Sequence, residues 1–78
     1  MARYYFHIRD SLGIIPDEEG MELLTIGAAQ TEALRSAEDI ARAAVDAGLE
    51  RRACTIDIAD EAGHIVGGVN VPELRKLA

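Results

Sequence analysis

The sequence has 78 residues, a formal net charge of −6 and a single cysteine, Cys54. A chain of this length predicts one domain, residues 1–78, whose core is expected to supply only about 3–5 kcal/mol of net stability. The 8 basic residues are scattered singly or in pairs, so they form no basic stripe that would indicate nucleic acid binding. One cysteine excludes an internal disulfide.

The N-terminal stretch carries charges where the apolar segment of a signal peptide would lie. In addition, no apolar run approaches the roughly 18–20 residues that are needed to span a bilayer. The sequence therefore predicts a cytoplasmic protein with no membrane partner.

The first predicted unit is a hairpin over residues 1–24. Within 3–9, Tyr4, Phe6 and Ile8 alternate with polar and aromatic side chains, which predicts a strand with one buried face. Asp10 and Gly13 match the chemistry of a tight turn, in which aspartate accepts a backbone hydrogen bond and glycine adopts positive φ. A short second strand is expected over 14–16, and extended pairing is expected to resume over 21–23, beyond a second D-x-x-G turn at 17–20.

The second predicted unit is one long helix over residues 25–48. Thr25 is a suitable N-cap and Gly48 a suitable C-terminal stop. Apolar and mostly small residues recur at i, i+3 and i+4 spacings and predict a buried stripe. This stripe comprises Ile26, Ala29, Ala33, Leu34, Ala37, Ile40, Ala41, Ala44 and Val45. The opposite, charged face is expected to be solvated and to form the i, i+4 pairs Arg35/Asp39, Glu38/Arg42 and Arg42/Asp46.

The third predicted unit is a hairpin over residues 49–71, with strands over 53–59 and 64–71. A D-x-x-G sequence at 60–63 repeats the turn chemistry of the first hairpin. One strand should direct Cys54, Ile56 and Ile58 to the core, and the other should supply a matching row of Ile65, Val69 and Val71. Residues 72–78 are expected to form a C-terminal tail.

Together these units predict an α+β fold of the ββαββ type. Pro16 cannot donate to a central ladder and the Gly67-Gly68 pair would weaken one, so the second and fourth strands are placed at the edges. The expected sheet is four-stranded and antiparallel, with the order 2-1-3-4. Its long helix is expected to cross over the first strand and to bury Phe6, Ile40 and Ile56 together.

With one helix covering one face, the other face of the sheet is expected to be open, and an open face with aromatic side chains is suited to binding a partner. The predicted interface residues on or near this face are Tyr5, His7, Arg9, Asp57, His64 and Val66. Because the core of a lone protomer is small, the sequence predicts a homodimer.

A catalytic site is not predicted. His7 and Asp57 are expected on the same sheet face, and such a pair can orient an imidazole as a base, but no nucleophile is indicated beside them. His7, His64 and Cys54 match no compact metal-ligand spacing. The glycines form neither a P-loop nor a dinucleotide-binding motif. We therefore predict a protein that is not an enzyme, with no catalytic, cofactor-binding or metal-binding residues.

The sequence R-Y-Y-F-H-I-R-D at 3–10, followed by Gly13, D-E-E-G at 17–20 and the helix residues Ala28, Ala29, Glu32 and Ala33, resembles a family of short bacterial proteins catalogued as domain of unknown function 6894. The chain departs from the pattern of that family at Leu24-Thr25 and at Gln30. The family has no established activity, so the resemblance implies a bacterial origin and no catalytic residue.

Two functional hypotheses follow. The favoured one is a small non-enzymatic interaction or homodimerisation module. The alternative is an acidic antitoxin-like or inhibitor subunit that binds a basic protein partner. The alternative rests on fold analogy, because a strand-turn-strand segment followed by an alanine-rich helix resembles the partial double-stranded-RNA-binding fold of HicB-type antitoxins.

Overall fold

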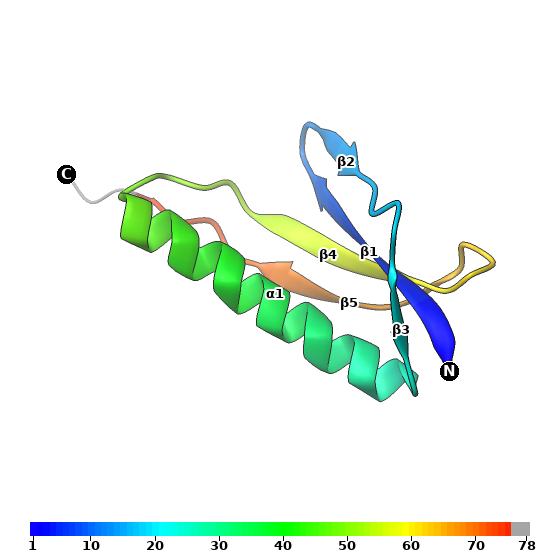
Figure 1. Ribbon diagram of the computed structural model, residues 1–78. Coiled ribbons are helices and arrows are strands. Elements are labelled where there is room, and N and C mark those ends of the chain that lie inside the picture. Colours follow the sequence, from blue (N-terminus) through cyan, green and yellow to red (C-terminus); the bar gives the residue numbers. More distant parts are fainter. Residues whose placement is uncertain (76–78) are drawn as a thin grey trace.

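The computed structural model describes residues 1–75, which form one helix and a five-stranded antiparallel sheet (Figure 1). The elements are β1 (Ala2–Asp10), β2 (Gly13–Ile15), β3 (Met21–Leu23), α1 (Ile26–Ala47), β4 (Cys54–Ala59) and β5 (Ile65–Val71). The prediction of an α+β fold with one long helix and an antiparallel sheet is confirmed.

The prediction of four strands is wrong, because the second strand is divided in two. β2 pairs with residues 8–10 of β1, and β3 pairs with residues 2–4 of the same strand. The sheet order is β2-β1-β4-β5, with β3 as an additional partner of β1. Pro16 lacks the backbone N–H that would continue the hydrogen-bond ladder, and the turn that follows it separates β2 from β3. The resumption of pairing over 21–23 is as predicted.

The predicted ends of α1 are confirmed by their capping contacts. The Thr25 hydroxyl accepts a hydrogen bond from the Ala28 amide at 3.0 Å, and Gly48 ends the helix with a φ of 66°. The three predicted i, i+4 ion pairs are not formed. Within residues 1–75, the helix has one internal ion pair, in which Arg35 donates to Glu32 at 2.9 Å.

The turn predictions at the D-x-x-G sequences 10–13 and 60–63 are also confirmed. Asp10 accepts a hydrogen bond from the Leu12 amide at 2.8 Å, and Asp60 accepts from the Ala62 amide at 3.0 Å. Gly13 and Gly63 both have positive φ, 142° and 87°. These aspartates therefore close hairpins, as expected from their short side chains.

The core lies between α1 and the β4–β5 part of the sheet. Ala29 and Ala33 of the helix are fully buried against Ile56 and Ile58, and small alanine side chains allow this close approach. The helix lies nearest to β5, with further contacts to β4 and β3 (Figure 1), and the expected course over β1 is wrong. As a result, Phe6 and Ile40 are only partly buried.

The predicted inner row of the last strand is wrong at one position. The register between β4 and β5 shifts between Ile58 and Ala59, so that Ile58 pairs with Gly67 and Ala59 pairs with Ile65. This β-bulge inserts one residue and changes which side chains face the helix. Val66 packs against the core, whereas Ile65 is 60% exposed.

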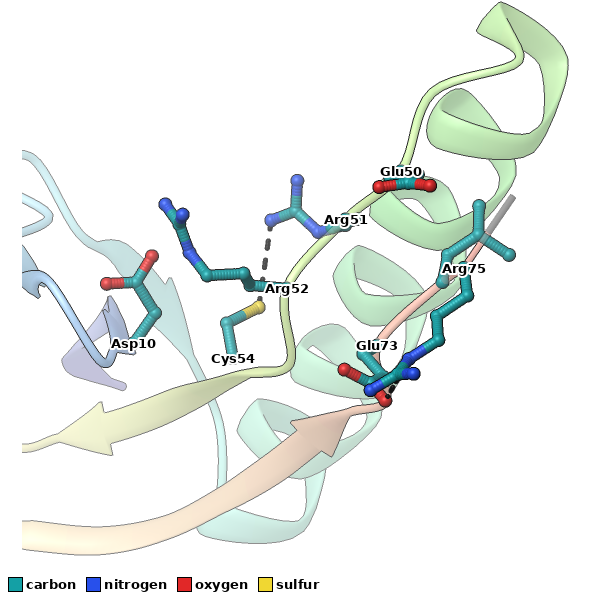
Figure 2. A pocket seen from close by; sticks show the side chains of 8 residues that line it. Asp10, Glu50, Arg51, Arg52, Cys54, Glu73 and Arg75 are labelled. Carbon is teal, nitrogen blue, oxygen red and sulfur yellow. Dashed lines mark hydrogen bonds and ion pairs between the residues drawn. The ribbon is translucent and has the colours of Figure 1, made fainter. Parts of the chain in front are cut away.

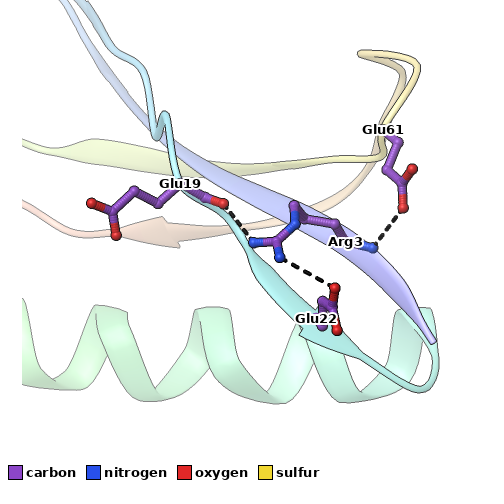
Figure 3. A network of polar contacts seen from close by, with 4 residues as sticks. All are labelled: Arg3, Glu19, Glu22 and Glu61. Atoms are coloured by element: carbon purple, nitrogen blue, oxygen red, sulfur yellow. Dashed lines mark hydrogen bonds and ion pairs between the residues drawn. The ribbon is translucent and has the colours of Figure 1, made fainter.

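Two further contacts hold the ends of the fold. At one end, the backbones of Arg51 and Leu74 exchange hydrogen bonds of 2.8 and 2.7 Å, so the predicted tail pairs with the chain after α1. Residues 76–78 of that tail lie outside the described residues. At the other end, the Arg3 guanidinium donates to the Glu19 carbonyl at 2.7 Å and to the Glu22 carboxylate at 3.2 Å (Figure 3).

Candidate interaction surface

One face of the sheet is not covered by α1, and we call it the open face. The alternation of β1 directs Tyr5, His7 and Arg9 to this face, and its register with β4 places them opposite Ala59, Asp57 and Thr55. The shift in β5 adds Ile65 opposite Ala59, and Ile14 of β2 lies opposite Arg9. The open face is therefore built from four strands.

Tyr5 and His7 form an ordered aromatic pair on this face. Their rings are stacked, with centroids 6.3 Å apart and an interplanar angle of 13°. The loop between β2 and β3 holds the His7 ring, because the Asp17 amide donates a hydrogen bond to His7 Nδ1 at 3.0 Å. A Cβ atom on Gly20 would lie 2.8 Å from the Tyr4 carbonyl oxygen, so only glycine allows the loop to approach β1 this closely.

Arg9 and Asp57 form an ion pair on the open face. Arg9 donates from Nε to one carboxylate oxygen at 2.8 Å and from Nη2 to the other at 3.2 Å. This hydrogen bond holds the pKa of Asp57 below its usual value; burial opposes the shift, while the charges of Arg9 and His7 add to it. The same bond raises the pKa of Arg9. The geometry is bidentate, which is the strongest arrangement for a guanidinium and a carboxylate.

His7 and Asp57 are cross-strand neighbours, as the sequence predicts. Their polar atoms nevertheless have other partners: Asp17 occupies Nδ1 of the imidazole, and Arg9 occupies both oxygens of the carboxylate. This arrangement orients both side chains within the sheet. It does not connect them to each other as a base and its orienting group.

Two of the predicted interface residues lie elsewhere. His64 is in the turn between β4 and β5, where its exposed ring lies 3.6 Å from the carboxylate of Asp60. Val66 faces the core because of the β-bulge, and Ile65 takes its place on the open face. The alternation of the sequence could not reveal this exchange, because Ile65 and Val66 are both apolar. The D-x-x-G turn at 60–63 was the available signal, since a turn closed by glycine is often followed by a bulge.

Residues 1–75 contain no cluster of three or more histidine, cysteine, aspartate or glutamate side chains arranged to hold a metal ion. In the same part of the chain, the single helix is not long and apolar enough to cross a membrane.

A sheet of this topology, with one helix on one face and a stacked aromatic pair beside an ion pair on the other, defines a small α+β protein with an open sheet surface. The chain belongs to the family described as Domain of unknown function (DUF6894), whose sequence pattern matches residues 3–72. The resemblance seen in the sequence is thereby confirmed. Neither a search of curated proteins nor a search of solved structures found a match.

Proposed function

We propose that this protein is a small non-enzymatic interaction module that acts as a homodimer, with the open face as its interface. The observation that carries the proposal is the imbalance between buried and exposed apolar side chains. Among the large side chains of residues 1–75, only Ile56, Ile58 and Val71 are fully buried, whereas Ile14 and Ile65 of the open face are each 60% exposed. A core this small gains stability from self-association.

The pattern of side chains on the open face suits a second copy of the chain. Tyr5 and Ile65 lie in one row across β1, β4 and β5, on either side of the buried Ala59, and supply the apolar surface of this row. Beside this row, Arg9 and Asp57 neutralise each other, so their burial would leave no unpaired charge. Because these two charges are opposite, the pair adds little repulsion between two acidic protomers.

Sedimentation equilibrium at micromolar concentration tests the proposal. We expect the parent protein to be a dimer and Ile65→Glu to be a monomer, because a buried carboxylate would lack a partner. Tyr5→Glu should act in the same way. Leu34 was predicted in the buried stripe of α1, but it is 49% exposed, so Leu34→Glu is the matched control and should remain dimeric. A monomeric parent contradicts the proposal, as does a Leu34→Glu monomer combined with an Ile65→Glu dimer.

A second candidate, an acidic subunit that covers a basic protein, is supported by the outer face of α1. Glu38, Asp39 and Asp46 are exposed there, and none of them forms an ion pair within residues 1–75. A basic protein that binds the parent, is released by salt and does not bind a Glu38→Lys/Asp39→Lys variant would support this candidate. If the parent and the Glu38→Lys/Asp39→Lys variant bound the basic protein equally, the outer face of α1 would be excluded as the binding surface.

A further inference from the structure

β1 has no strand partner over residues 5–7 on the side where β2 and β3 lie. β2 pairs with residues 8–10 and β3 pairs with residues 2–4, so a gap remains between the two short strands. The Asp17 carboxylate fills this gap, because its Oδ2 atom accepts a hydrogen bond from the Phe6 amide at 3.1 Å. The loop between β2 and β3 thus covers the free edge of β1 with a single side chain.

The same loop residue binds His7, and this contact defines the protonation state of the imidazole. The Asp17 amide donates to His7 Nδ1 at 3.0 Å. A backbone amide can only donate, so Nδ1 carries no proton and the ring is neutral, with its proton on Nε2. The ring is half-buried and therefore reached by solvent, and histidine is the side chain whose charge ordinarily changes between pH 5 and 8. A proton on Nδ1 would set two donors against each other.

Four titratable or charged side chains face His7 from the surrounding elements. Asp57 lies opposite on β4, Asp17 lies in the loop, and Tyr5 and Arg9 are its neighbours on the same face of β1. The pKa of Asp57 is lowered by its bond with Arg9, and the pKa of Asp17 is lowered by backbone hydrogen bonds that outweigh burial, so both carboxylates stay ionised at pH 5. Both oxygens of Asp57 are bound by Arg9, whereas Oδ2 of Asp17 has one backbone donor. Asp17 is therefore the carboxylate that a charged imidazole can recruit.

We propose that residues 16–18 form a pH-sensitive latch on β1, which is closed while His7 is neutral and opens when His7 takes a proton from water. In the closed state, Asp17 offers an amide donor to His7 and a carboxylate acceptor to Phe6. The imidazolium needs an acceptor instead of a donor, so Oδ2 of Asp17 turns from the Phe6 amide to the new Nδ1–H. The Phe6 amide, and with it the edge of β1 between β2 and β3, is then released to solvent.

The far end of the loop stays attached in both states. The Arg3 guanidinium donates to the Glu19 carbonyl at 2.7 Å (Figure 3), and an arginine keeps its charge throughout this pH range. The opening is thus confined to the part of the loop that contacts Phe6 and His7. A local change of this kind should leave the ladder between β1 and β4 intact.

Nuclear magnetic resonance on the full chain tests the closed state. The ring ¹⁵N shifts of His7 report its tautomer, and a scalar coupling between the Asp17 amide nitrogen and Nδ1 reports the hydrogen bond itself. At pH 8 we expect the Nε2–H tautomer and the coupling, and at pH 5 we expect a protonated ring and no coupling. An Nδ1–H tautomer at pH 8 overturns the proposal, as does a ring that is still neutral at pH 5.

Hydrogen exchange measures the opening. The protection factor of the Phe6 amide, which is corrected for the intrinsic effect of pH on exchange, should fall about tenfold or more between pH 8 and pH 5, because water replaces a charge-assisted hydrogen bond. The most protected amides of β4 are the reference and should keep their protection factors. A Phe6 amide that stays equally protected at pH 5 contradicts the proposal.

Two variants identify the group that controls the latch. In His7→Asn, the amide oxygen Oδ1 takes the place of Nδ1 and accepts a hydrogen bond at every pH, so the protection of the Phe6 amide should no longer depend on pH. The sequence has one other histidine, His64, whose exposed ring lies 3.6 Å from Asp60. His64→Asn is the matched control and should respond to pH as the parent does. If His7→Asn lost the protection of Phe6 in acid as the parent does, His7 would not be the controlling group.

Discussion

The carboxylate of Asp17 accepts a hydrogen bond from the backbone amide of Phe6 at 3.1 Å, at the position where β1 has neither β2 nor β3 beside it. Its other oxygen accepts from the amides of Glu19 and Gly20, each at 3.2 Å. Burial alone would raise the pKa of Asp17. The hydrogen bonds from the three amides lower it by more than burial raises it, so the pKa lies below the usual value. One side chain therefore replaces a missing strand residue and shapes the loop.

Replacement of Asp17 by alanine should lower the free energy of unfolding by about 1–3 kcal/mol, because the Phe6 amide would lose its partner. Urea unfolding at neutral pH measures the change. Glu18→Ala, in the same loop, is the control: the Glu18 side chain is exposed and forms no hydrogen bond or ion pair within residues 1–75, so stability should change by less than about 0.5 kcal/mol. Equal midpoints for the two variants would show that the Asp17 contacts contribute nothing to stability.

The ion pair of Arg9 and Asp57 predicts a loss of stability in acid. The pKa of Asp57 is lowered in the folded state, mainly by its hydrogen bond with Arg9. The folded state therefore binds the proton less readily than the unfolded chain does. The resulting stabilisation is complete above the unfolded pKa of about 3.9 and disappears as the pH falls through the lower folded value.

Urea unfolding of the parent and of Asp57→Asn between neutral pH and acid measures this effect. We expect Asp57→Asn to be less stable at neutral pH and to lose less stability on acidification than the parent does. The pKa of Asp17 is also lowered, so Asp17 contributes to the remaining loss of stability with falling pH in both the parent and the variant. Parallel stability curves for parent and variant would contradict the role of Asp57.

The sequence predicted local features better than it predicted distant ones. The ends of α1 and the two hairpin turns depend on capping and turn chemistry within a few residues, and Thr25, Gly48, Asp10 and Asp60 carry that chemistry. The bulge beside Ile65 also depends on how β5 aligns with β4, and the alternation of two adjacent apolar residues, Ile65 and Val66, does not show which of them faces the core.

The candidate site shows the same division. Tyr5, His7, Arg9 and Asp57 share a face because strands alternate, so the sequence could place them together. Their actual hydrogen bonds could not be predicted, because the partner of His7 comes from a loop whose course depends on Asp17 and Gly20. The open depression lined by Arg51, Cys54 and Glu73 (Figure 2) was not predicted, since it exists only where the chain after α1 meets residues 73–75.

The position of the core predicts that replacing two isoleucines by alanine has very different effects on stability. Ile58 is fully buried, whereas Ile15 is 67% exposed on β2. Ile58→Ala should cost about 2–5 kcal/mol, an amount comparable to the whole stability of so small a domain. Ile15→Ala should cost less than about 0.5 kcal/mol. Thermal unfolding followed by circular dichroism compares them, and similar midpoints would contradict the position of the core described above.

Gln30 protects the free edge of β5. Its side-chain amide donates to the Gly68 carbonyl at 2.7 Å, and its oxygen lies where a Cβ atom on Gly67 would be only 2.8 Å away. A polar side chain that occupies an edge carbonyl blocks pairing with another strand there. Gly67 is therefore required by the position of Gln30, whereas Gly68 is required by the backbone itself, since its Cβ would lie 2.7 Å from the Ile56 carbonyl oxygen.

This difference predicts the outcome of a double-mutant cycle measured by urea unfolding. Gly67→Ala should cost about 0.5–1.5 kcal/mol in the parent, because the new methyl group displaces the Gln30 side chain and breaks its hydrogen bond. In a Gln30→Ala background the same substitution should be neutral or slightly stabilising, since the clash is gone and alanine loses less backbone entropy than glycine on folding. Gly68→Ala should destabilise both backgrounds equally, because a carbonyl of β4 cannot move aside as a flexible side chain can. If the cost of Gly67→Ala were the same with and without Gln30, the glycine would be required for a reason other than this contact.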